Sequence, residues 1–89
     1  MSGNPKHIFY GITRKIFSRL RKKASRLGIR VVSPKGEAIK DGVRIEWNYD
    51  AVEQKLEVEC KMPFWINSAQ VNRKVRDEIE VTLRSLRAA

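Results

Sequence analysis

Several features that would indicate an enzyme or a membrane protein are missing from this chain of 89 residues. Its one cysteine, Cys60, excludes an internal disulfide framework and a cysteine-rich zinc site, and it favours a reducing compartment such as the cytoplasm. Its one histidine, His7, has no acid or thiol close by in the sequence with which to form a catalytic dyad. No phosphate-binding loop or metal-ligand spacing is present, and no apolar run approaches the roughly 20 residues of a membrane span. We therefore expect a non-enzymatic cytoplasmic protein without cofactor, metal site or integral membrane segment.

Acidic residues are absent from the first 36 positions, which hold ten basic residues. The remaining positions hold nine basic and ten acidic residues, so the net charge of +9 arises entirely from the N-terminal part. This asymmetry points to nucleic acid, an anionic membrane surface or an acidic protein as partner. An N-terminus rich in arginine and free of acids also resembles an organelle transit peptide. We favour a domain segment, because the apolar spacing of the first helix continues into the domain without a break.

Residues 11–27 (GITRKIFSRLRKKASRL) have the apolar spacing of an amphipathic helix, and Gly28 follows at the position of a helix C-cap. The apolar side carries Ile12, Ile16, Phe17, Leu20, Ala24 and Leu27. The opposite side is basic, and its residues are the candidates for binding nucleic-acid phosphates: Arg14, Lys15, Arg19, Arg21, Lys22 and Arg26. Four of these lie at steps of four, three and four, and so form a cationic ridge about 16 Å long: Lys15, Arg19, Lys22 and Arg26.

The middle of the chain predicts three strands, at 29–33, 43–49 and 55–61. A loop at 50–53 would set Trp47 opposite Leu56 and Ile45 opposite Val58, with every apolar side chain on one face. Asp41-Gly42 is a hairpin signal, so that a short additional strand at 37–40 is the alternative to a loop.

A second helix is expected to begin after Asn67, which with Gln70 forms a capping-box pattern, and to run to about Leu86. The prediction is an α+β domain at 8–89 with the order αβββα, preceded by a flexible N-terminus at 1–7. Both helices would pack on one face of a three-stranded antiparallel meander, because both alternating strands have a single apolar face. The expected core centres on Trp47, Ile45, Val58, Leu20, Ile16, Val75 and Ile79.

Cys60 and the aromatic residues have a structural and a functional interpretation. Cys60 occupies an inward strand position, where a thiol acts as a small hydrophobic group. The aromatic side chains are expected mainly to fill the space between sheet and helices. Phe64 and Trp65 lie in a predicted turn, and in the alternative interpretation they stay exposed as a partner-binding patch.

The double-stranded-RNA-binding domain has the same predicted order of elements, a helix, three antiparallel strands and a helix. This chain resembles that domain in topology alone. That family reads RNA partly with a lysine cluster at the start of its second helix. Here the corresponding residues 67–70 carry no charge, and basic residues begin only at Arg73 and Lys74, so that no site residue is carried over.

The chain also resembles small bacterial polyhydroxyalkanoate-system proteins. The resemblance rests on the pairing of Gly42-Val43-Arg44-Ile45 with Val58-Glu59-Cys60, between an amphipathic first helix and a closing helix at 71–86. It implies the same fold and gives little indication of activity. Three functions follow from the whole pattern, in this order: a nucleic-acid-binding module of low sequence specificity, a protein that docks on an acidic partner or polymer granule, and a helix lying on a membrane surface.

Overall fold

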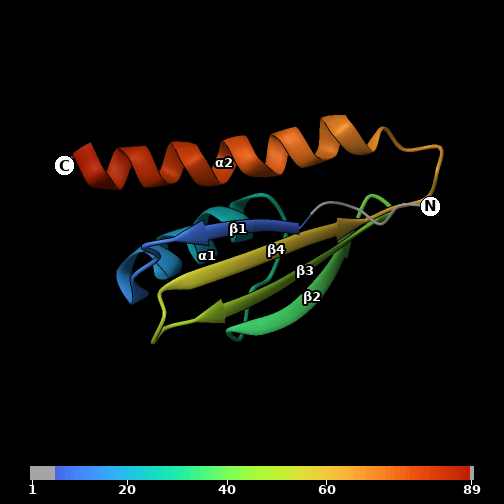
Figure 1. Ribbon diagram of the computed structural model, residues 1–89. Coiled ribbons are helices and arrows are strands. Elements are labelled where there is room, and N and C mark those ends of the chain that lie inside the picture. The colour runs from blue at the N-terminus through green and yellow to red at the C-terminus, as the bar shows by residue number, and fades with distance from the viewer. Residues whose placement is uncertain (1–5, 89) are drawn as a thin grey trace.

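The computed structural model describes residues 6–88 as a four-stranded antiparallel sheet with two helices (Figure 1). The α+β class and the meander of three consecutive strands are confirmed, and a fourth strand joins them, so that the sheet order is β1-β4-β3-β2. The element order is thus βαβββα rather than αβββα. The elements are β1 (Lys6–Tyr10), α1 (Arg14–Arg26), β2 (Lys35–Lys40), β3 (Val43–Asp50), β4 (Lys55–Lys61) and α2 (Ser68–Ala88).

The first strand replaces part of the predicted flexible N-terminus. Residues 1–5 of that segment lie outside the described residues, but the prediction is wrong for Lys6 and His7, which begin β1. The alternation of KHIFY places His7 opposite Val58 and Phe9 opposite Leu56, on the apolar face of β4. Gly11 then adopts a positive φ of 74°, which glycine does without steric cost, and the chain leaves the sheet for α1.

The second strand lies later in the chain than the main prediction placed it. Residues 29–33 form no strand, and the alternative strand at 37–40 is the better prediction, since β2 covers Lys35–Lys40. The preceding segment instead meets β3 through two hydrogen bonds. The backbone N–H of Tyr49 donates to the carbonyl of Pro34 (2.7 Å), and the Trp47 indole N–H donates to the carbonyl of Ser33 (2.9 Å).

The pairing of β3 with β4 differs from the prediction by two residues. Trp47 lies opposite Val58 and Tyr49 opposite Leu56, whereas Trp47 was expected opposite Leu56. The reason is the turn, because Asp50 still belongs to the ladder and its carboxylate accepts hydrogen bonds from the backbone N–H groups of residues 52 and 53. A shift of two residues keeps every side chain on its predicted face, since the side-chain period of a strand is two.

Both helices pack on the same face of the sheet, with α2 running alongside β1 and α1 lying across the sheet (Figure 1). The buried cluster consists of Ile12, Phe17, Trp47, Tyr49, Leu56, Val58 and Leu83. Trp47 and Val58 are thus core residues as predicted. The other predicted core residues are only partly buried and pack around this cluster: Ile16, Leu20, Ile45, Val75 and Ile79. On the side of α1 the core is therefore formed by Ile12 and Phe17 rather than by the predicted Ile16 and Leu20.

Candidate nucleic-acid interface

Helix α1 is fixed at both ends by the residues that flank it. The Thr13 hydroxyl accepts a hydrogen bond from the backbone N–H of Ile16 (3.2 Å), as an N-cap does. At the other end the N–H of Gly28 donates to Ser25 and that of Ile29 to Ala24, at 3.0 and 2.8 Å. These two bonds form a Schellman motif, in which Leu27 is the C-cap and Gly28 follows it with a φ of 87°, so that the predicted helix end at this glycine is confirmed. The helix therefore has defined ends, and its basic residues have fixed positions along its axis.

The rotation of α1 about its axis is set by one aromatic contact. Phe17 is buried and stacks on Tyr49 of β3, with ring centroids 4.2 Å apart and an interplanar angle of 10°. The Tyr49 hydroxyl donates to the buried carbonyl of Ile12 (2.7 Å), which ties the start of the helix to the same ring. Burial raises the pKa of Tyr49, and the nearby positive charge of Arg14 partly opposes this shift. These contacts turn the basic side of α1 away from the sheet.

All six predicted binding residues are exposed: Arg14, Lys15, Arg19, Arg21, Lys22 and Arg26. The four residues of the cationic ridge (Lys15, Arg19, Lys22 and Arg26) form no ion pair within residues 6–88. Arg21 differs from them, because its Nε donates to the carbonyl of Val31 (2.8 Å) and so braces the following loop.

One further cation of α1, Lys23, has an acidic partner. Its Nζ lies 3.2 Å from the carboxylate of Glu78 on α2 and 3.4 Å from the Glu78 carbonyl oxygen. This ion pair joins the two helices at the side of α1 that faces α2. Because Glu78 pairs with Lys23, it does not neutralise the cationic ridge, which has no acidic partner in the described part of the chain.

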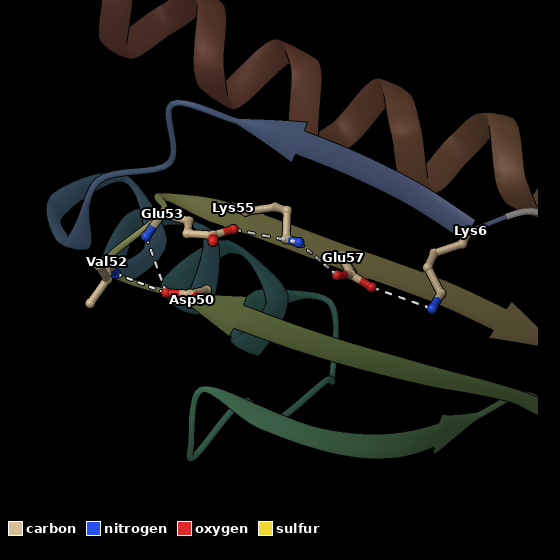
Figure 2. A network of polar contacts seen from close by, with 6 residues as sticks. All are labelled: Lys6, Asp50, Val52, Glu53, Lys55 and Glu57. Carbon is tan, nitrogen blue, oxygen red and sulfur yellow. Dashed lines mark hydrogen bonds and ion pairs between the residues drawn. The ribbon is translucent and has the colours of Figure 1, made fainter.

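The outer face of the sheet shows the opposite behaviour along one row of cations, each of which has an acidic partner. This ion-paired row consists of Lys6, Lys55, Lys61 and Arg44, and Figure 2 shows the part around Glu57. Glu57 lies between Lys6 at 3.3 Å and Lys55 at 3.4 Å. The hydrogen bond from Lys6 and then that from Lys55 lower the pKa of Glu57, while Glu57 raises the pKa of Lys55. Further pairs on this face join Lys61 to Glu46 and Arg44 to Glu37, at 3.1 and 3.2 Å. The four cations of the ridge on α1 thus lack the acidic partners that these side chains have.

The second predicted site, Phe64 and Trp65, is exposed to solvent. Phe64 is 96% exposed and Trp65 73% exposed, and their rings meet edge to face with centroids 5.3 Å apart. The expectation that they fill the core is wrong. The alternative of exposure is confirmed, because the turn before α2 carries both rings away from the sheet. Asn67 then caps α2 as predicted, accepting from the N–H of Gln70 (3.1 Å).

His7 and Cys60 lie in the interior. Nε2 of His7 and Oδ1 of Asn72 on α2 are 3.0 Å apart, and both side chains are buried. This polar link between β1 and α2 was not foreseen from the sequence, although the alternation of KHIFY could have indicated an inward histidine. Cys60 is fully buried, and burial raises the pKa of its thiol, with the charge of Glu59 adding to the effect. Both side chains therefore lie in the buried interior, where they contribute to packing between the elements.

Over residues 6–88 we find no cluster of three or more His, Cys, Asp or Glu side chains with the geometry of a metal site. Neither described helix combines the length and the apolar character needed to cross a bilayer. Comparison of the chain with family models, with curated proteins and with solved structures gives no match.

Proposed function

We propose that the protein binds nucleic acid through phosphate contacts made by the cationic ridge of α1, with little sequence preference. The observation that carries the proposal is the ridge itself: four exposed cations on one rigid helix, without an acidic partner in the described part of the chain. Cations spaced along about 16 Å suit a row of phosphates. The ridge has no outward Asn or Gln side chain of the kind that reads adenine edges, and attraction between a row of cations and phosphates does not depend on sequence. The proposal includes a cytoplasmic location, which the single free thiol supports.

The ridge differs from two other charged parts of the surface, because its cations have no carboxylates beside them. On the outer sheet face each cation of the ion-paired row sits within 4 Å of a carboxylate, so that its field is largely cancelled. On α2 the acids Asp77, Glu78 and Glu80 lie between two groups of cations. A polyanion therefore meets its strongest uncompensated attraction along α1.

The experiment compares two double charge reversals that lower the net charge of +9 by the same four units. Arg19→Glu with Lys22→Glu alters the cationic ridge, and Arg73→Glu with Arg84→Glu alters exposed positions of α2. We expect the ridge variant to lose binding to a 20-base-pair duplex at 50 mM salt, and the α2 variant to lose much less. Neither variant should shift the melting temperature appreciably, because all four side chains face solvent. Equal loss of binding in both variants would show that net charge, and not the ridge, attracts the duplex.

A second candidate function is supported by the exposed pair of Phe64 and Trp65. Large aromatic side chains are enriched at protein interfaces, and two of them in contact on a turn form a compact apolar anchor. In this alternative an acidic protein, or a polymer granule, binds both the turn and α1. Failure of the wild-type protein to bind RNA or DNA at 50 mM salt would favour this second function.

A further inference from the structure

A groove of about 460 Å³ lies between the two helices and the sheet. Its walls are apolar, and among the residues that line it are Leu20 and Leu27 from α1 and its C-cap, Ile45 from β3, and Val75 and Ile79 from α2. Small-molecule sites in proteins have volumes of about 300–1,000 Å³ and mostly apolar walls. The groove therefore has the size and lining of a ligand site.

The groove exists because the two helices cover the sheet incompletely. Ile45 points inward from a central strand, yet it is only partly buried, while its inward neighbours Val43 and Trp47 are 8% and 7% exposed. Helix α1 ends at Arg26, and the Schellman turn at Gly28 directs the chain away before it covers this part of the sheet. Leu27 at the same end is 38% exposed. Apolar surface is thus left open to a ligand.

The interior of the groove offers nothing to a polar ligand. Within residues 6–88 no buried side-chain nitrogen or oxygen lacks a hydrogen-bond partner. The Trp47 indole, which borders the groove, already donates to Ser33. A polar group placed inside would lose its bonds to water and gain none. The part of a ligand that enters the groove must therefore be a hydrocarbon.

The rim of the groove is cationic. It carries four basic side chains, Arg21, Lys23, Lys40 and Lys74, against the two acids Asp41 and Glu78. Lys23 is paired with Glu78. Lys40 and Lys74 form no ion pair in the described part of the chain, and Lys40 reaches across from the end of β2, so that a Cβ built on Gly28 would lie 2.8 Å from its Nζ. Asp41 also forms no ion pair among the described residues, so that the rim side chains outside the Lys23–Glu78 pair are three cations and one anion. Their net positive charge complements an anionic head group.

We propose that this groove binds a fatty acid, with the aliphatic chain between the helices and the sheet and the carboxylate at Lys40 and Lys74. Each methylene moved from water into the groove should tighten binding about fourfold. The carboxylate at the rim stays partly hydrated and gains the attraction of two ammonium groups. The site is separate from the cationic ridge of α1, so that the proposal does not depend on nucleic-acid binding.

The test is calorimetric titration of the full chain with octanoate, decanoate and dodecanoate, each below its micelle concentration. We expect the affinity to rise about 15-fold with each pair of methylenes, and decanol to bind more weakly than decanoate. The double variant Lys40→Ala with Lys74→Ala should lower the affinity for decanoate and leave that for decanol unchanged. Arg73→Ala with Arg84→Ala is the matched control, which removes two charges that do not line the groove and should change neither affinity.

The location of the ligand is read from isoleucine methyl signals. Decanoate should shift the signals of Ile45 and Ile79, which line the groove, and leave those of Ile8 and Ile39, which are exposed outside it. An affinity that does not depend on chain length, shifts confined to Ile8 and Ile39, or an absence of binding would overturn the proposal. Displacement of decanoate by an acidic peptide that binds more tightly would also overturn it, by assigning the groove to a protein partner.

Discussion

At the scale of single residues, Tyr49 shows how one side chain can serve two parts of the fold. Its ring stacks on Phe17, and its hydroxyl satisfies the carbonyl of Ile12, a residue with no exposed surface. The sequence predicted that Tyr49 faces inward, because it continues the alternation of its strand. It could not predict the hydrogen bond, since the partner is a backbone group 37 positions away whose place depends on the whole fold.

Replacing Tyr49 with phenylalanine keeps the stacking and removes the hydroxyl. We expect the free energy of unfolding to fall by about 1–3 kcal/mol, because the Ile12 carbonyl stays buried without a donor. Urea unfolding measures the difference. Tyr10→Phe is the matched control, since Tyr10 is 67% exposed, and it should change stability by less than about 0.5 kcal/mol. Similar losses in both variants would show that the Tyr49 hydroxyl does not hold α1.

At the scale of helices and strands, the sequence was informative where a local signal defined the boundary. Gly28 and Asn67 were predicted from such signals, and they mark the end of α1 and the start of α2 in the structure. The N-cap Thr13 was not predicted, and α1 begins at Arg14 rather than at residue 11. The sequence pattern did not reveal β1, a strand of five residues whose partner β4 lies about 50 positions later in the chain. It also misplaced the register of β3 and β4, because two pairings that differ by two residues bury the same faces.

The ion-paired row on the outer sheet face makes stability depend on pH. The pKa of Glu57 is held below its ordinary value of 4.5 in the folded protein, chiefly by the hydrogen bond from Lys6. The contribution of the Glu57 carboxylate to the free energy of unfolding is therefore complete above pH 4.5. It is lost as the pH falls through the pKa that Glu57 has in the folded protein. We expect Glu57→Gln to lower stability at pH 7 and to flatten the loss of stability below pH 4.5.

Urea unfolding between pH 3 and 7 measures this effect. Glu80→Gln is the control, because Glu80 is exposed on α2 and has no ion pair among the described residues. The Glu80 variant should follow the wild-type pH dependence more closely than the Glu57 variant does. Identical curves for the two variants would show that the pairs of Glu57 with Lys6 and Lys55 contribute nothing measurable.

At the scale of the whole molecule, the sequence predicted the charge distribution and missed the groove. The basic face of α1 could be read from residue order, because helical periodicity alone decides which side chains share a side. The groove depends on the distance between α1 and α2, on the point where α1 ends over the sheet and on the position of Lys40 in space. None of these is a local property, and the apolar residues that line the groove were expected to fill the core.

If the ridge of α1 binds nucleic-acid phosphates, as we propose, the affinity must fall steeply as the salt concentration rises. With about four phosphates neutralised on duplex DNA, log affinity should fall against log salt concentration with a slope near −3.6. The affinity should then fall about 150-fold between 50 and 200 mM salt, and by similar factors for duplexes of unrelated sequence. A slope near zero, or an absence of binding at 50 mM salt, would show that the ridge does not bind nucleic-acid phosphates.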